Sequence, residues 1–360
     1  MKILFFSENL HSGGKERRIV ELIKELSKYK RYEIELVLTR KNIHYEEIER
    51  YGTKIHYLER KIWKKDPSVF LRFFLLAKKF NPDCIHVWGR MVAIYAIPTA
   101  RLLNIPLINS EITDAPEGIL PPELSLRLTM KYSDCIIANS GAGIKAYGAP
   151  QDKSTVIHNG FDFSRLDNLQ DKKTIRRELG VTTEFVVIMI GTYYYKKDYP
   201  TFLKAAEMLL NKRRDITFIG MGSGDPAPYR GLIQEKNRDR IKLMPSRQNV
   251  EEVMNIADIG VLATFTEGIS NSILEFMALS KPVVVTGKGG CEELVMNDEN
   301  GFLYDPGNYG KMADQINILL DDMQTRYEFG KRSREIVAEE FSQEKMIEKF
   351  IEIYSSYAHA

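Results

Sequence analysis

Residues 3–38 read ILFFSENLHSGGKERRIVELIKELSKYKRYEIELVL, and this stretch sets the fold class. The apolar run Ile3–Phe6 predicts a short buried strand, and Glu33–Leu38 predicts a second one. Between them, Arg18–Tyr29 carries apolar residues at the spacing of one helix face, namely Ile19, Leu22, Ile23 and Leu26. A strand, a glycine-containing turn, a helix and another strand in this order indicate a β-α-β unit with parallel strands.

The same alternation continues along the chain and then starts again. Strands are predicted in the first series at Ile3–Phe6, Glu33–Leu38, Cys84–Trp88, Pro106–Ile108 and Cys135–Ala138, and in the second at Phe185–Ile190, Ile216–Ile219, Ile241–Leu243, Ile259–Leu262 and Pro282–Val285. These runs lack strict polar alternation, which is typical of parallel strands buried on both faces. Two such series predict two doubly wound α/β domains, and ligands of such domains bind at the carboxyl ends of the strands.

The boundary between the domains is expected near residues 158–175, where the turn-rich stretch His158–Asp162 precedes the polar run Asp167–Lys173. We therefore predict an N-terminal domain at residues 1–163, a C-terminal domain at residues 164–342 and a final helix within residues 343–360. The net charge of +2 hides an asymmetry. Residues 1–163 hold 25 Lys+Arg against 19 Asp+Glu, whereas the remainder holds 26 against 30.

The composition excludes several classes of protein. The 360 residues are 44% hydrophobic and 28% charged, as in ordinary globular proteins, and their near-neutral balance argues against nucleic acid as a partner. Cys84, Cys135 and Cys291 are widely spaced, which argues against a disulfide framework and a cysteine zinc site. We find neither a signal peptide nor a run of about 18 apolar residues, so we expect a cytoplasmic protein.

Two glycine-containing loops follow predicted strands. Gly13 and Gly14 precede the first helix, where free backbone N–H groups favour a phosphate, although an ordinary strand-to-helix turn explains them equally well. Gly191 follows the strand Phe185–Ile190, with Lys196 and Lys197 shortly after it. A lysine in this position could neutralise a diphosphate leaving group, and the alternative is a pair of solvated lysines.

The segment Glu267–Glu275, EGISNSILE, follows the strand Ile259–Leu262 and leads into a helix. Its glycine and small polar residues leave backbone N–H groups available to sugar or phosphate oxygens, and its two carboxylates can accept hydrogen bonds from hydroxyl groups. The alternative is that Ser272 and Glu275 form a capping box and that Glu267 is a solvated loop residue.

Several motifs together resemble those of the retaining glycosyltransferases of family 4, which have the two-domain GT-B fold. The matching segments are Gly13-Gly14, Asn159-Gly160-Phe161-Asp162, Gly191 with Lys197, the E-x7-E pair Glu267 and Glu275, Lys281-Pro282-Val283-Val284, Gly289-Gly290 with Glu293, and Asn300-Gly301. The resemblance covers essentially the whole chain and is most specific between residues 185 and 303. It implies two Rossmann-like domains that face each other across a cleft, with the C-terminal helix crossing back to the first.

The resemblance also implies the substrates and the site. The donor is expected to be a nucleoside-diphosphate sugar, with UDP as the nucleotide, and the acceptor a saccharide or a lipid-linked saccharide; no cofactor and no metal ion are expected. Lys197 matches the lysine that binds the diphosphate, Glu267 the residue that contacts the transferred sugar, and Glu275 the residue that binds the ribose. Further donor contacts are implied at Gly13, Gly14, Arg247, Gly268, Ile269, Ser270, Asn271 and Ser272.

This chain departs from the family pattern at two places. Thr192 stands where the family usually has an arginine, and Lys196 is the candidate to supply the missing charge. The family often has a histidine after the strand that corresponds to Pro106–Ile108, and none of the six histidines lies near this strand in the sequence. We expect a mechanism in which the leaving phosphate takes the proton of the acceptor while the enzyme positions the reactants and stabilises charge.

Two other functions stay open on the sequence. One is a non-catalytic subunit that binds a nucleotide sugar, which the Thr192 substitution favours. The other is a glycoside hydrolase that uses Glu267 and Glu275 as its acid and base, which leaves the glycine-containing loops without a role.

Residues 54–79 hold eight Lys or Arg residues against Glu59 and Asp66. Trp63, Phe70, Phe73 and Phe74 lie among them. A basic amphipathic helix can lie on an anionic membrane, so the pattern leaves open a peripheral membrane contact through residues 60–80, at the inner face of the membrane. The alternative is a helix that packs on the sheet with its lysines in solvent.

Overall fold

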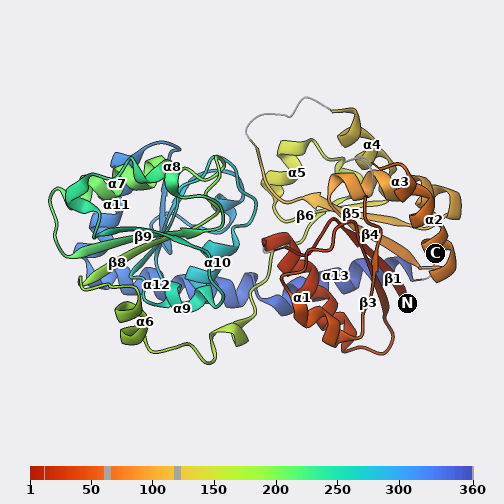
Figure 1. Ribbon diagram of the computed structural model, residues 1–360, viewed down its shortest axis with the longest axis horizontal. Coiled ribbons are helices and arrows are strands. Elements are labelled where there is room, and N and C mark those ends of the chain that lie inside the picture. The colour runs from red at the N-terminus through yellow and green to blue at the C-terminus, as the bar shows by residue number, and fades with distance from the viewer. Residues whose placement is uncertain (12, 61–65, 117–122, 359–360) are drawn as a thin grey trace. The chain divides into compact units, whose positions relative to one another are not determined.

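The computed structural model describes residues 1–11, 13–60, 66–116 and 123–358. The chain forms two compact units, one of Met1–Asn159 with Glu344–Ala360 and the other of Gly160–Gln343. Each unit is built on a parallel sheet with helices on both faces (Figure 1), so the predicted α/β class with two doubly wound sheets is confirmed.

The first unit contains a seven-stranded sheet in the order β3-β2-β1-β4-β5-β6-β7. Its strands are β1 (Lys2–Ser7), β2 (Glu33–Leu38), β3 (Lys54–Tyr57), β4 (Cys84–Trp88), β5 (Leu107–Ile112), β6 (Cys135–Ala138) and β7 (Ser154–Val156). Its helices are α1 (Gly14–Ser27), α2 (Ser68–Phe80), α3 (Arg90–Leu103), α4 (Leu124–Tyr132), α5 (Gly141–Tyr147) and the C-terminal α13 (Gln343–Tyr357). Residues of α1 and α13 form one hydrophobic core with the sheet, and residues of α2 and α3 form another. These two pairs of helices therefore cover opposite faces (Figure 1).

Helix α13 is fixed to the first unit by buried polar and aromatic contacts. The Tyr354 hydroxyl lies 2.6 Å from His86 Nδ1, and the Arg18 guanidinium lies 4.9 Å from the Phe350 ring centre and 5.5 Å from that of Trp88. Burial lowers the pKa of Arg18 to about 9 and the pKa of His86 well below its usual value. His86 is therefore a neutral structural residue that joins α13 to β4.

Strand β5 differs from its prediction. The expected strand Pro106–Ile108 ends too early, because β5 continues through the polar residues Asn109, Ser110 and Glu111 to Ile112. Most of these polar groups make contacts inside the protein: Ser110 Oγ lies 2.8 Å from His86 Nε2, Thr129 Oγ1 donates to Glu111 Oε1 at 2.5 Å, and Glu111 Oε2 lies 3.4 Å from Arg90 Nε. The register with β6 shifts between Asn109 and Ile112, as in a β-bulge.

The second unit contains a six-stranded sheet in the order β10-β9-β8-β11-β12-β13. Its strands are β8 (Phe185–Ile190), β9 (Ile216–Gly222), β10 (Ile241–Pro245), β11 (Ile259–Leu262), β12 (Val283–Thr286) and β13 (Gly301–Tyr304). Its helices are α6 (Lys172–Glu178), α7 (Tyr199–Leu210), α8 (Ala227–Arg230), α9 (Val250–Asn255), α10 (Asn271–Ala278), α11 (Tyr309–Asp321) and α12 (Met323–Glu340). Strands β3, β7 and β13, each three or four residues long and at an edge of its sheet, were not predicted.

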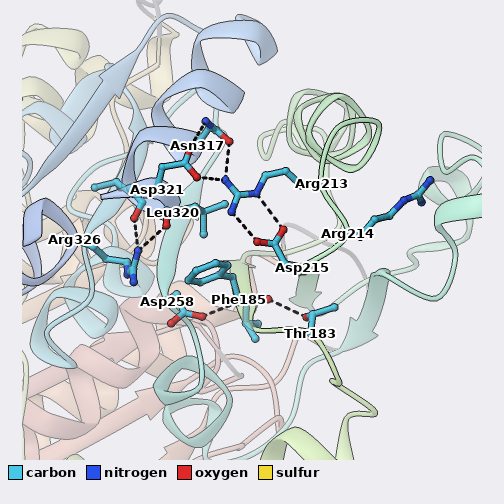
Figure 2. A network of polar contacts seen from close by, with 12 residues as sticks. Thr183, Phe185, Arg213, Arg214, Asp215, Asp258, Asn317, Leu320, Asp321 and Arg326 are labelled. Atoms are coloured by element: carbon cyan, nitrogen blue, oxygen red, sulfur yellow. Dashed lines mark hydrogen bonds and ion pairs between the residues drawn. The ribbon is translucent and has the colours of Figure 1, made fainter. Parts of the chain in front are cut away.

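A polar network ties the amino ends of β8 and β9 to helix α11 (Figure 2). Arg213 donates from Nε and Nη2 to Asp215 at 3.1 and 2.7 Å, and from Nη1 to Asn317 and Asp321. The Arg213 hydrogen bonds lower the pKa of Asp215. This network lies at the end of the sheet opposite to the loops that the sequence marks as functional, and its role is to brace the fold.

Candidate active site

Lys197 is held at the carboxyl edge of the second sheet by the loop that follows β8. Gly191 leaves room for its side chain, because a Cβ at Gly191 would lie 3.3 Å from Lys197 Cγ and 3.4 Å from Cδ. The backbone of Lys197 pairs with Thr264 in the loop after β11, and Asp198 caps α7 by accepting from Thr201 N at 3.1 Å. The spacing of Gly191 and Lys197 therefore has a steric reason: the lysine stem lies over the glycine.

Lys197 and Glu267 form an ion pair through Nζ and Oε2. Their side chains are 16% and 18% exposed, so the pair is mostly buried but can be reached from solvent. The two residues that the sequence predicts to be catalytic are thus in contact. The arrangement places a cation and a hydrogen-bond acceptor side by side, as binding of a sugar diphosphate requires.

The acidic loop that carries Glu267 is supported by a second glycine-containing loop. Gly290 lies in the short 3-10 helix Gly289–Glu293. Its backbone N–H donates to the carbonyl oxygen of Glu267 at 3.1 Å. A Cβ at Gly290 would lie 2.5 Å from Gly268 O and 2.8 Å from Ile269 N, so the two backbones touch directly. Only glycine permits this approach at Gly290.

Helix α10 begins at Asn271, with Ser270 at its N-cap position, and Ser270 Oγ lies 3.2 Å from Ser272 Oγ. Ser272 is therefore inside the helix, and the alternative of a capping box with Glu275 is wrong. Glu275 is 4% exposed and accepts a hydrogen bond from Arg165 Nη2 at 2.7 Å.

Arg165 and Glu251 belong to this site, and the sequence analysis missed both. Arg165 lies in the short 3-10 helix Phe163–Leu166, stacks 4.9 Å from the Phe161 ring centre, and contacts Glu251 as well as Glu275. One arginine therefore holds two buried carboxylates on α9 and α10. Its position three residues after Asp162, at the end of a family motif, is the signal that could have found it.

Arg247 lies in the loop after β10, next to this cluster. It donates to Glu178 at 2.9 Å and to Glu252 at 3.3 Å, and Glu252 adjoins Glu251 on α9. Lys196 is half-buried, and its carbonyl accepts from Phe265 N and Thr264 Oγ1, each at 3.0 Å. The second unit thus places the predicted residues 196, 197, 247, 267–272 and 275 at the carboxyl edge of its sheet, in the loops after β8, β10 and β11 and at the start of α10.

Gly13 and Gly14 lie at the corresponding edge of the first unit. Helix α1 begins at Gly14, with Gly13 as an N-cap in extended conformation, so the structure gives the predicted turn before a helix N-terminus. Lys15 Nζ and Glu16 Oε1 are 3.0 Å apart in this turn.

The absence of a histidine after the strand Pro106–Ile108 in the sequence stands, but a histidine of another strand lies close to it in space. His86, on the neighbouring strand β4, contacts Ser110. It is completely buried between Ser110 and Tyr354, so it supports the fold and does not take the place of the family histidine.

With this geometry established, comparisons with known proteins give the family. Residues 12–165 match the family described as Glycosyltransferase Family 4, and residues 184–322 match Glycosyl transferases group 1. Together these matches cover most of the chain, which therefore belongs to the family 4, group 1 glycosyltransferases.

Individual relatives agree with this assignment. The chain is 26% identical to N-acetyl-alpha-D-glucosaminyl L-malate synthase of Bacillus anthracis, over 78% of this chain and 76% of that protein. It is 25% identical to N-acetylgalactosamine-N,N'-diacetylbacillosaminyl-diphospho-undecaprenol 4-alpha-N-acetylgalactosaminyltransferase of Campylobacter jejuni, over 92% and 94%. The crystal structure of Anabaena Alr3699/HepE with UDP and glucose matches 99% of this chain and all of that chain, with a TM-score of 0.84 and 23% identity. The two-domain GT-B fold of these glycosyltransferases is thereby confirmed.

The described residues lack two further features. Helices long and apolar enough to cross a bilayer do not occur in the part of the chain that the structure describes. Within the same residues, no three side chains of His, Cys, Asp or Glu gather as a metal site would require, and metal independence stays a prediction.

Proposed function

We propose that this protein transfers a hexosyl group from a UDP-sugar to a hydroxyl group of a saccharide or lipid-linked acceptor, with retention at the anomeric carbon, in the synthesis of a cell-surface polysaccharide. The observation that carries the proposal is the Lys197–Glu267 pair at the carboxyl edge of the second sheet. UDP is favoured because Alr3699/HepE was crystallised with UDP and glucose. A lipid-linked acceptor is favoured because several relatives are named as transferases that act on diphospho-undecaprenol saccharides.

In this proposal the bond between the anomeric carbon and the diphosphate oxygen breaks, and a bond to the acceptor oxygen forms on the same face of the sugar. Lys197 stabilises the charge that develops on the departing diphosphate, and Glu267 orients the sugar through its hydroxyl groups. The proton of the acceptor passes to the leaving phosphate, so no protein base is required. Glu275, fixed by Arg165, binds the ribose, and the backbone N–H groups at the start of α10 contact the phosphates.

Release of UDP tests this assignment. We expect Lys197→Ala and Glu267→Ala each to lower turnover by about 100-fold or more, since each removes a group that acts on developing charge or on substrate position. Lys204→Ala on α7 and Glu235→Ala are matched controls, because both side chains are exposed on the same unit. Undiminished turnover in both site variants would refute the assignment of Lys197 and Glu267 to the active site.

A non-catalytic subunit that binds a nucleotide sugar is the second candidate, and Thr192 favours it. Thr192 is exposed in the loop before Lys197, where the family usually has an arginine. A panel of UDP-sugars separates the two candidates: thermal stabilisation by one donor with no UDP release, whatever the acceptor, would favour the subunit. The hydrolase alternative loses support, because Glu267 and Glu275 each have a cationic partner.

We further propose a cytoplasmic location at the inner face of the membrane, where a lipid-linked acceptor would be met. Nucleic acid is not expected as a partner, because the overall charge is nearly balanced.

A further inference from the structure

The outer side of the helix layer α2–α3–α4 carries apolar residues where a soluble protein normally has polar ones. Helix α3 contacts both α2 and α4, so the three form one layer on the same side of the first sheet (Figure 1). Their exposed leucines are Leu71 (64%) and Leu75 (56%) on α2, Leu102 (75%) on α3, and Leu124 (71%) and Leu128 (37%) on α4.

These residues follow the helical repeat, so each helix turns one apolar stripe outward. The leucine pairs of α2 and α4 are each four residues apart, and on α3 the half-buried Ile94 and the exposed Pro98 lead to Leu102 at the same spacing. Single exposed leucines are common on protein surfaces, but three neighbouring helices with outward apolar stripes form a patch.

The charge of the layer is one-sided. Within the bounds of these three helices stand seven basic residues and no Asp or Glu: Arg72, Lys78, Lys79, Arg90, Arg101, Arg127 and Lys131. Three of them pair with acidic residues outside the helices, namely Arg72 with Asp66, Arg90 with Glu111 and Glu123, and Arg101 with Asp134. Helix α1, on the opposite face, mixes its basic residues with Glu16, Glu21 and Glu25. Among these helices of the first unit, the excess of basic over acidic residues therefore lies mainly on the face of α2, α3 and α4.

Helix dipoles explain only part of this pattern. Basic residues in the last turn, such as Lys78, Lys79, Arg101 and Lys131, are favourable on any helix. The same effect favours acidic residues at a helix start, where Asp66 accepts from Ser68 N before α2 and Glu123 is the N-cap residue of α4. The dipole does not account for Arg127, which stands in the middle of α4. The three helices run in the same direction because each leads into a strand of a parallel sheet. Their last turns therefore place a row of cations along one edge of the leucine patch.

We propose that the outer face of α2, α3 and α4 is a membrane-docking surface, whose leucines enter the interface of an anionic bilayer while the flanking cations contact lipid phosphates. The inference deepens the membrane contact within the proposed function. A second copy of the chain is the less suitable occupant, because a symmetric dimer through this face would bring the two rows of cations together.

The proposed membrane-docking surface differs from the segment 60–80, which the sequence indicates as a possible membrane contact. Of the segment 60–80, Trp63, Lys61, Lys64 and Lys65 lie outside the described residues. Phe73 is completely buried in the core and Phe70 and Phe74 are half-buried, so α2 packs on the sheet as the alternative expected. The surface available to a membrane consists instead of Leu71 and Leu75 together with residues of α3 and α4.

Flotation with vesicles tests the surface without any transfer assay. We expect the full chain to float with vesicles of phosphatidylcholine mixed with phosphatidylglycerol, to bind pure phosphatidylcholine weakly, and to dissociate partly at high salt. The variant R127E/K131E should bind anionic vesicles about thirtyfold more weakly, because it loses the attraction of two cations to the lipid phosphates. Repulsion between the new carboxylates and the lipids should weaken binding further. The variant L124S/L128S should bind roughly tenfold more weakly.

Matched changes on the second unit are the controls. Ile318 and Met323 are 48% and 74% exposed, and I318S/M323S should bind as the wild type does; so should K331E, whose lysine is exposed on α12. Wild-type binding in both α4 variants, or failure of the wild type to bind, would overturn the proposal. So would a dimer that L124S/L128S converts to a monomer. UDP release by the same preparations is measured separately, so a failed docking surface and a failed transferase remain distinguishable.

Discussion

Gly290→Ala is the sharpest test of how the fold holds the acidic loop, because the substitution adds one methyl group to a residue that does not contact substrate in our proposal. The new Cβ would lie 2.5 Å from Gly268 O and 2.8 Å from Ile269 N. Both are backbone atoms, so no side-chain rotation relieves the clash. The segment that carries Glu267 must retreat by about 1 Å to restore van der Waals separation.

The expected cost follows from that displacement. A shift of about 1 Å in a group that positions substrate lowers the rate by roughly 100-fold, which corresponds to about 2.7 kcal/mol in the activation free energy. Moving the loop also strains the hydrogen bond from Gly290 N to Glu267 O. The Lys197–Glu267 pair loses its alignment, while the core of the second unit stays in place.

Steady-state release of UDP measures the effect, and thermal unfolding shows whether the variant is folded. Gly231→Ala is the control, because a Cβ at Gly231 meets no atom within 4 Å and its backbone φ of −66° suits alanine. A folded Gly290→Ala enzyme with turnover equal to that of Gly231→Ala would refute the reasoning, since the loop would then tolerate the displacement.

Three further predictions concern stability. Arg165→Met should lower the free energy of unfolding in urea by about 3 kcal/mol, because the carboxylates of Glu251 and Glu275 stay buried without the cation that they share. An unchanged unfolding midpoint would contradict the role given to Arg165. Tyr354→Phe should cost about 1–2 kcal/mol, because Nδ1 of buried His86 loses its hydrogen-bond partner while Nε2 keeps Ser110; equal stability would show that the bond to Tyr354 does not hold α13. Burial lowers the pKa of Lys281 to about 7, so the unfolded chain binds one more proton than the folded protein between pH 7 and the usual lysine pKa. In thermal unfolding, the stability of the wild type relative to that of Lys281→Met should therefore rise with pH over this range. A difference between the two proteins that does not change with pH would exclude the proton linkage.

The sheet strands were predictable where they are apolar and buried on both faces. Phe185–Ile190 and Ile259–Leu262 coincide with β8 and β11, because short apolar runs bounded by turn residues are typical of parallel strands buried on both faces. Strand β5 was cut short because Asn109 and Glu111 look like loop residues. Their partners, such as Thr129, come from a helix that local sequence does not reveal.

The candidate site was predictable where the chemistry lies in a compact motif and not where it depends on distant partners. Lys197 and Glu267 are 70 residues apart, yet each follows a strand, and parallel strands bring their carboxyl ends to one edge. Arg165 is 110 residues from Glu275, and although the motif that ends at Asp162 points to the region of Arg165, it does not indicate Glu275 as the partner. The Ser272–Glu275 capping box failed because α10 begins at Asn271, which places Ser272 inside the helix.

The discontinuity of the first unit determines the order in which the protein can be completed during synthesis. Residues 1–159 leave the ribosome before the second unit, but the helix that covers Trp88 and His86 is translated only after the whole second unit. The second unit is a continuous stretch of chain and can close its own core as soon as it emerges. The first must wait, with the apolar face that receives Phe350 uncovered, and it is the part for which a nascent chain would need protection from aggregation.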